Sequence, residues 1–207
     1  MLIKVCGMTR ADNIRQVEAL GIDLMGFIFY PPSPRYVREP PAYLPTRAKR
    51  VGVFVDADKA EMLETAGRFG LDYLQLHGTE SPELCAELRS AGYRIIKAVR
   101  ALPQELERPR WEADLLLFDT PTPAHGGSGQ PFNWTLLQHY RGEIPFLLSG
   151  GIGAEQAAAL RAIRHPRFAG IDLNSRFECA AGVKEVPRLC TFLSELRAEP
   201  HPSAFSS

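Results

Sequence analysis

The chain has 207 residues, of which 45% are hydrophobic and 23% charged, so it can bury a sizeable core and is not disordered as a whole. Lys plus Arg and Asp plus Glu both number 24, so no global charge favours nucleic acid or an anionic membrane. No apolar run approaches the roughly 18 residues of a membrane span, and the N-terminus lacks the apolar stretch of a signal peptide. These features predict a cytoplasmic protein that binds neither nucleic acid nor membrane.

Eight short, nearly continuous apolar runs recur along the chain and predict buried parallel strands. They are Leu2–Cys6, Asp23–Phe29, Val51–Val55, Tyr73–Leu76, Ile95–Val99, Leu115–Phe118, Phe146–Leu148 and Phe168–Leu173. Stretches with helical periodicity lie between most of these runs and include Ala11–Leu20, Lys59–Phe69, Pro82–Ala91, Trp134–Tyr140 and Ala154–Ile163.

This alternation of strand and helix predicts an α/β fold, since parallel strands need a crossover between them. Eight repeats leave roughly 26 residues per unit, which suits a compact barrel. A doubly wound sheet is the alternative, but Cys6-Gly7-Met8-Thr9 follows the first strand where that fold usually has a GxGxxG turn. We therefore predict a single-domain (β/α)8 TIM barrel over residues 1–198. Residues 40–45 and 102–111 have little helical signal, and the Pro- and Ser-rich residues 199–207 predict a disordered tail.

Polar residues follow most of the predicted strands. In a (β/α)8 barrel the chemistry gathers at the C-terminal ends of the strands, so these residues are the candidates for a site. We expect one mouth of the barrel to be surrounded by Cys6, Arg35, His77, Asp119, Gly150, Gly151, Asn174 and Ser175.

Each of these side chains also has a purely structural interpretation. A thiol at a strand end, such as Cys6 on the same strand face as Lys4, ordinarily fills space, but at a polar mouth it can serve as a base or nucleophile. Asp119 either caps the loop after its strand or takes part in chemistry. Arg35 either pairs with a substrate carboxylate or is an ordinary surface residue. His77 either donates a hydrogen bond to substrate or ties down its own loop.

The glycine-rich stretches indicate a phosphate site and a lid. Residues 149–153 are typical of a turn whose backbone amides approach a phosphate, with help from the helix N-terminus that follows. Residues 121–131 are too rich in glycine to be rigid and predict a mobile lid. The four cysteines show no CxxC spacing and the histidines other than His77 show no ligand spacing, so we predict free thiols and no metal site.

Taken together, the sequence motifs of this chain resemble those of the phosphoribosylanthranilate isomerase family over almost the entire chain. Any one of the matching motifs is weak, but their common order is highly specific. The motifs are Lys4–Thr9, Gly26–Phe29, Pro32–Val37, Val51–Val55, Leu74–Gly78, Phe118–Thr120, Gly126–Gly129 with Phe132–Trp134, Leu148–Ile152 and Gly170–Ser175.

The resemblance implies a cofactor-independent aldose–ketose isomerase of tryptophan biosynthesis, monomeric or homodimeric. Its small phosphorylated substrate, N-(5-phosphoribosyl)anthranilate, would undergo an Amadori rearrangement to 1-(2-carboxyphenylamino)-1-deoxyribulose 5-phosphate. Cys6 would be the general base, for which its pKa would have to be lowered, and Asp119 the general acid. Arg35 would hold the anthranilate carboxylate and His77 would belong to the substrate shell. The phosphate would be held by backbone amides around Gly150, Gly151, Asn174 and Ser175.

Some residues depart from the family pattern. Asn133 replaces a common Asp, which changes little because both residues cap helices well. Gln130 stands in the predicted lid where relatives commonly have Lys or Arg, so the resemblance does not imply a contribution of this position to closure of the lid. Arg176 either adds charge to the phosphate site or projects into solvent, and we favour solvent.

Two other functions remain as alternatives. Indoleglycerol phosphate synthase is a related barrel, but its lysine before a Ser-Pro-Ser-Lys-Gly motif has no counterpart near Pro34 and Arg35. A barrel that binds a phosphorylated metabolite without turning it over would not need both Cys6 and Asp119.

Overall fold

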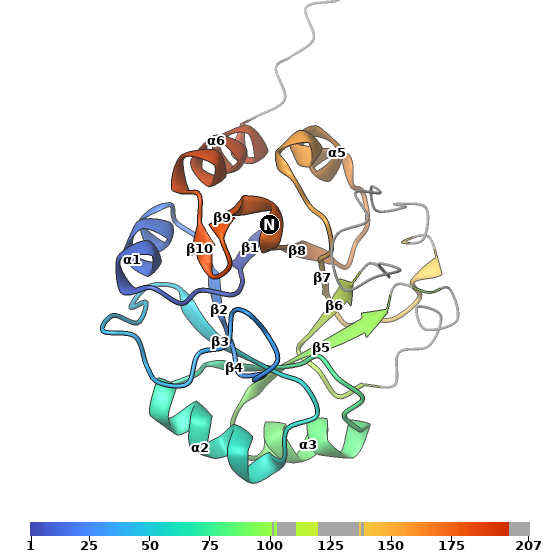
Figure 1. Cartoon of the computed structure of the whole chain (residues 1–207). Helices are drawn as coiled ribbons and strands as arrows, with labels where there is room; N and C mark the ends of the chain where they lie inside the picture. The colour runs from blue at the N-terminus through green and yellow to red at the C-terminus, as the bar shows by residue number, and fades with distance from the viewer. Residues whose placement is uncertain (101, 103–110, 120–136, 138, 199–207) are drawn as a thin grey trace, which may run out of the picture.

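The computed structural model describes residues 1–100, 102, 111–119, 137 and 139–198. Eight parallel strands form a closed barrel in which neighbours in the sequence pair with each other and β8 pairs with β1 (Figure 1). The fold class is therefore confirmed, and the predicted strands agree with the observed ones to within two residues at either end. The strands are β1 (Leu2–Val5), β2 (Leu24–Ile28), β3 (Lys49–Phe54), β4 (Tyr73–Leu76), β5 (Arg94–Arg100), β6 (Leu115–Asp119), β7 (Phe146–Leu148) and β8 (Phe168–Leu173).

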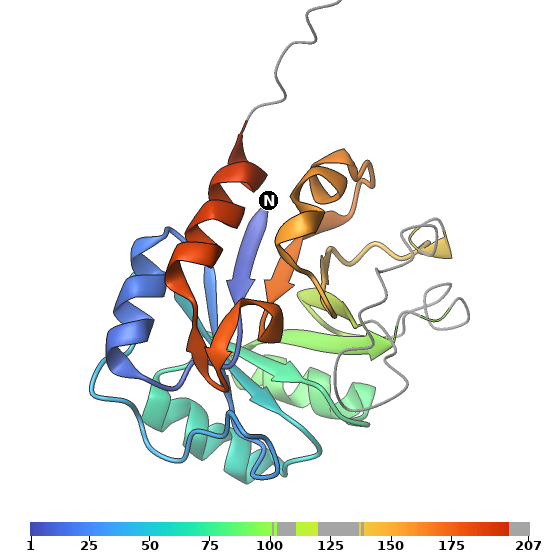
Figure 2. The same ribbon diagram turned by 45° about the horizontal axis from the view of Figure 1, so that its top comes forward.

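Helices surround the barrel, as Figures 1 and 2 show from two directions. They are α1 (Ala11–Ala19), α2 (Lys59–Phe69), α3 (Pro82–Ser90), α5 (Ala157–Ala162) and α6 (Val186–Arg197). The helix predicted over Ala154–Ile163 is shorter than expected, because its first turn is a 3-10 helix, η2 (Ala154–Gln156). The predicted helix Trp134–Tyr140 lies largely outside the described residues, and the predicted tail lies wholly outside them.

Local capping residues explain where two of the helices begin and end. The Asp58 side chain accepts a hydrogen bond from the Glu61 backbone amide at 2.8 Å, so α2 begins after Asp58. The same helix stops at Gly70, whose φ of 58° lies in the left-handed region that favours glycine. Ser81 caps α3 in the same way as Asp58, and Pro82 occupies the first helical position.

The segment between β2 and β3 is fully described and contains no helix, in agreement with the weak helical signal of residues 40–45. A buried carboxylate on α1 holds this segment in place. Glu18 accepts hydrogen bonds from the backbone amides of Thr46, Arg47 and Ala48 at 2.7, 2.6 and 3.1 Å. Burial alone would raise the pKa of Glu18, but the Tyr43 hydroxyl and these amides outweigh burial and lower it.

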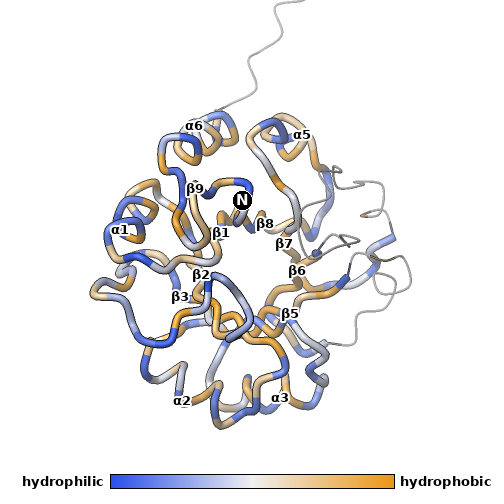
Figure 3. Tube along the Cα trace, viewed as in Figure 1, coloured by the Kyte–Doolittle hydropathy of each residue, from blue (hydrophilic) through white to orange (hydrophobic). Residues whose placement is uncertain are grey.

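The core has two parts, and the strands that separate them are largely hydrophobic in Figure 3. A larger cluster packs the helices onto the outer face of the barrel and includes Phe27, Phe69, Phe118 and Phe146. The inner cluster fills the barrel itself with Leu24, Val51, Tyr73, Ile96, Leu115, Leu117 and Leu147. Each such side chain contributes about 1.5–3 kcal/mol when fully buried, so the barrel is a packed core rather than a pore.

One feature after β8 was not predicted. The chain forms a 3-10 turn, η3 (Ser175–Phe177), and then a two-stranded antiparallel sheet of β9 (Glu178–Ala180) and β10 (Val183–Lys184) (Figures 1 and 2). This hairpin, which carries Glu178 and Lys184, follows the C-terminal end of β8. Among the described residues, no helix is both long and apolar enough to cross a membrane.

Candidate active site

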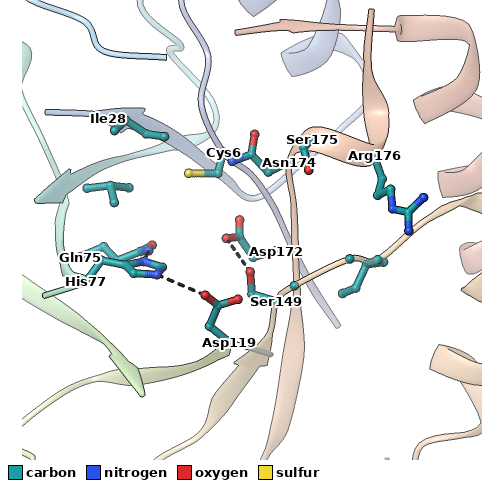
Figure 4. Close-up of a pocket in the computed structure, with 14 residues that line it drawn as sticks. Cys6, Ile28, Gln75, His77, Asp119, Ser149, Asp172, Asn174, Ser175 and Arg176 are labelled. Carbon is teal, nitrogen blue, oxygen red and sulfur yellow. Dashed lines mark hydrogen bonds and ion pairs between the residues drawn. The ribbon is translucent and has the colours of Figure 1, made fainter. Parts of the chain in front are cut away.

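A cavity of about 210 Å³ opens at the C-terminal ends of the barrel strands (Figure 4). This is the end of the barrel at which the sequence places the candidate residues, and most of them border the cavity. The lining residues are Cys6, Ile28, Val53, Gln75, His77, Asp119, Ser149, Gly150, Gly151, Ile152, Asp172, Asn174, Ser175 and Arg176.

Cys6 lies directly after β1 and is 4% exposed. Lys4, two residues earlier on the same strand face, is fully buried, and its Nζ donates a hydrogen bond to Asp172 Oδ1 at 2.8 Å. Burial raises the pKa of the Cys6 thiol, and the charge of Lys4 offsets this only in part. The expectation that the pKa of Cys6 is lowered is therefore wrong for this structure, because the cost of burying a thiolate outweighs the attraction of the ammonium group.

Asp119 ends β6 and points into the cavity opposite the β4 residues (Figure 4). Its Oδ2 lies 3.4 Å from Nε2 of His77. On the other side of the imidazole ring, the Gln75 amide nitrogen lies 2.8 Å from Nδ1 of His77. If the amide donates, Nδ1 accepts, so a neutral ring carries its hydrogen on Nε2 and directs it at Asp119. His77 thus contacts the proposed acid directly, and Gln75 orients the ring.

The loop after β7 has the backbone that a phosphate cradle requires. Gly150 and Gly151 have φ angles of 85° and 65°, which strongly favour glycine at both positions. Successive residues in such a turn direct their amides toward one side, where an anion can bind. The helix expected to strengthen this site begins only as the 3-10 turn η2, so its dipole contributes less than the sequence suggested.

The end of β8 completes the rim with Asn174, Ser175 and Arg176. The Asn174 side-chain oxygen accepts a hydrogen bond from Lys184 Nζ at 2.8 Å. Arg176 lines the cavity and is partly exposed, so its side chain borders both the site and solvent. The 3-10 turn η3 starts at Ser175 and brings the next side chain to the rim, where it adds positive charge beside the glycine loop.

Arg35 is the candidate that does not line the cavity. Its guanidinium forms an ion pair with Glu178, with Nη2 2.6 Å and Nε 2.9 Å from the two carboxylate oxygens. The hydrogen bonds to Glu178 raise the pKa of Arg35. The side chain runs close to Gly7, where an added Cβ would lie 2.6 Å from Arg35 Cδ. Arg35 is therefore next to the site but turned toward the β9–β10 hairpin.

Several residues that the structure brings to the site belong to the strand-end motifs but were not among the residues predicted to act in it. Gln75, Asp172 and Ser149 line the cavity, and Ser149 Oγ lies 3.4 Å from Asp172 Oδ2. Two of the buried charges could have been found from the sequence. Lys4 and Asp172 are charged residues within strands that are otherwise apolar, so each must have a partner. Gln130 and the predicted lid, residues 121–131, lie outside the described residues. Within the described residues, no group of three or more His, Cys, Asp or Glu side chains could hold a metal ion.

Comparison with known proteins places this geometry in a family. A sequence model described as N-(5'phosphoribosyl)anthranilate (PRA) isomerase matches residues 3–195. The chain belongs to the phosphoribosylanthranilate isomerase family. The N-(5'-phosphoribosyl)anthranilate isomerase of Parabacteroides distasonis is 48% identical over 206 residues, which cover 95% of this chain and 93% of the relative. Family membership makes the chain an isomerase of tryptophan biosynthesis.

Solved structures of phosphoribosylanthranilate isomerases share the fold. The enzyme of Thermus thermophilus has a TM-score of 0.79 and 32% identity, with 95% of this chain and 98% of that chain covered. A second structure, with a TM-score of 0.75 and 27% identity over the same shares, is a complex with reduced 1-(o-carboxyphenylamino)-1-deoxyribulose 5-phosphate. That phosphoribosylanthranilate isomerase therefore binds a phosphorylated small molecule.

Proposed function

We propose that Cys6 and Asp119 are the general base and general acid of an Amadori rearrangement of N-(5-phosphoribosyl)anthranilate. The observation that carries the proposal is that both side chains border one cavity from different strands. Asp119 gives its proton to the furanose oxygen as the bond from C1 to that oxygen breaks, which leaves a Schiff base to the anthranilate nitrogen. The Cys6 thiolate then takes a proton from C2, and the electron pair forms the enamine that rearranges to the ketone.

The remaining candidates bind the substrate. Backbone amides around Gly150, Gly151, Asn174 and Ser175 hold the phosphate, and the charge of Arg176 adds to this site. His77 contacts Asp119 at 3.4 Å and keeps the acid directed at the ring oxygen. This proposal explains why polar groups converge on one end of the barrel.

Arg35 takes the anthranilate carboxylate, for which a guanidinium is well suited because it binds carboxylates in a bidentate manner. In this structure Glu178 occupies that position on Arg35. Substrate binding therefore requires Arg35 to exchange one carboxylate for another or to share its donors between them.

The test is to incubate the pure protein with freshly generated phosphoribosylanthranilate and to follow the loss of its fluorescence together with the identity of the product. Cys6→Ala and Asp119→Asn should each lower kcat by about 10²–10⁴-fold while phosphate binding changes far less. Cys190→Ala, which removes an exposed thiol on α6, is the matched control and should behave like the wild type.

Loss of substrate only at the uncatalysed rate would refute the proposed isomerase activity and favour a barrel that binds without turnover. Near-wild-type turnover in either variant of Cys6 or Asp119 would refute the assigned base or acid. The oligomeric state, monomer or homodimer, and a location in the cytosol stay predictions of the same proposal.

A further inference from the structure

The mechanism above gives no role to the buried cation on the strand that leads to Cys6. Lys4 lies inside the barrel on β1 with 0% of its side chain exposed, and Asp172, its register partner on β8, is 6% exposed. An ammonium group at such a site loses its hydration and is expensive to bury. An apolar side chain at this position would fill the barrel at lower cost, so the charge itself requires an explanation.

The strand geometry places Lys4 beside Cys6. Alternate residues of a strand point to the same face, so the side chains at positions 4 and 6 both face the barrel axis. Asp172 lines the cavity, and its Oδ1 accepts the hydrogen bond from Lys4 Nζ at 2.8 Å. Burial alone would lower the pKa of Lys4, but Asp172 and Cys6 together raise it, so Lys4 carries its charge at neutral pH.

The charged groups that face Cys6 come from several elements and do not balance. Lys4 pairs with Asp172 across β1 and β8, whereas Arg35 and Lys184 both pair with Glu178, each at 2.6 Å. Within these two ion-pair groups three cations meet two carboxylates, which leaves one surplus positive charge, and Arg176, which also borders the cavity, adds a further one. A thiolate at Cys6 would neutralise the surplus charge of the ion-pair groups. Across the cavity lie His77 and Asp119, which contact each other.

We propose that Lys4 is a positioning residue that stabilises the thiolate form of Cys6, with Asp172 fixing the ammonium group near the sulfur. The proposal rests on the proposed role of Cys6 as the base. Lys4 is fully buried and does not line the cavity, so it acts through Cys6 rather than on the substrate. Its charge is compensated while Cys6 is a thiolate, and it loses that partner when the thiolate takes the proton from C2.

The experiment measures the ionisation of Cys6 directly, as the thiolate ultraviolet absorbance of each protein minus that of its Cys6→Ala counterpart, across pH. Lys4→Met removes the charge and keeps the length of the side chain. Lys4→Met/Asp172→Asn removes both charges, which avoids leaving an unpaired buried carboxylate and protects the fold. Circular dichroism confirms that each variant is folded.

We expect the thiolate fraction at a fixed pH on the rising part of the curve to fall about tenfold in Lys4→Met, because a nearby opposite charge favours the ionised form by this order. Asp172→Asn alone should shift the curve in the opposite direction, since it removes a negative charge near the sulfur. In Lys4→Met kcat should fall with little change in KM, as expected for loss of an interaction with the base rather than with the substrate.

The matched control is Lys97→Met/Glu80→Gln, which removes an equally buried ion pair with the same 2.8 Å separation but on β5 and the loop after β4. Its Cys6 ionisation curve should coincide with that of the wild type. A wild-type curve in both Lys4 variants, or an equal shift in the control, would overturn the role of Lys4. Because the curve is read without turnover, this outcome is distinct from near-wild-type activity of Cys6→Ala, which would instead refute the base.

Discussion

The ion pair between Lys97 and Glu80 predicts a large, specific loss of stability when one partner is removed. Lys97 on β5 and Glu80 in the loop after β4 are 2% and 1% exposed, with 2.8 Å between Nζ and Oε2. Lys97 also donates to the backbone oxygens of Leu76 and Gly78 at 3.3 and 2.8 Å. Glu80 in turn accepts from the Gly78 amide. The pair therefore fixes the loop that begins with His77.

The expected magnitude follows from the separation of the charges. Two unit charges 2.8 Å apart attract each other by about 6 kcal/mol at an effective dielectric constant of roughly 20, before the cost of burying them. Lys97→Met leaves Glu80 as an uncompensated buried carboxylate, so the free energy of unfolding should fall by about 3–5 kcal/mol. Adding Glu80→Gln removes that charge as well, so the double variant should recover part of the loss.

The assay is equilibrium urea unfolding followed by circular dichroism, with the slope m compared between variants. Lys59→Met is the control, because Lys59 and Glu87 are also 2.8 Å apart but 43% and 55% exposed. A surface pair contributes little, so this variant should unfold near the wild-type midpoint. An equal loss in Lys97→Met and Lys59→Met, or a double variant less stable than Lys97→Met, would refute the reasoning.

Three further variants test other contacts. Glu18→Gln should lower stability by about 1–3 kcal/mol at neutral pH. The pKa of Glu18 is lowered in the folded protein, so its carboxylate stabilises the fold above the usual pKa of a glutamate, and this contribution is lost as the pH falls through the folded value. Thermal melts across pH should show the stabilities of the two proteins converging in acid. Gly170→Ala should give little folded protein by circular dichroism, since its Cβ would lie 2.0 Å from the Leu2 backbone oxygen. Gly26→Ala places a Cβ 2.7 Å from Cys6 Sγ, so steady-state kinetics should show a lower kcat in a folded protein, and an unchanged kcat would contradict the position assigned to the thiol.

The strands could be predicted because each is a solid apolar run. Runs such as Leu115–Phe118 and Phe146–Leu148 are buried on both faces and need no tertiary information to be recognised. The site could be located because the polar residue that follows each run lies, by topology, at one end of the barrel. Cys6 and Asp119 meet at one cavity for this reason alone.

The features of the site that could not be predicted depend on contacts between residues far apart in the sequence. The partner of Arg35 is Glu178, 143 residues later, on a hairpin that has only a few residues in each strand. The direction of Arg176 depends on η3, a 3-10 turn that leaves no periodic signal. The pKa of Cys6 depends on the balance between burial and Lys4, which the order of residues does not reveal.

Stability and chemistry are separated along the axis of this barrel. The inner apolar cluster, with Tyr73 and Leu115 among its members, fills the interior, whereas the polar side chains that face the cavity lie at or just after the C-terminal ends of the strands. Asp119 has a side chain that is 40% exposed, so replacing it removes little packing. The variant Asp119→Asn should therefore lose turnover and keep most of the wild-type thermal stability, whereas changes at Lys97 should lose stability first. This difference allows a loss of catalysis to be told apart from a loss of fold.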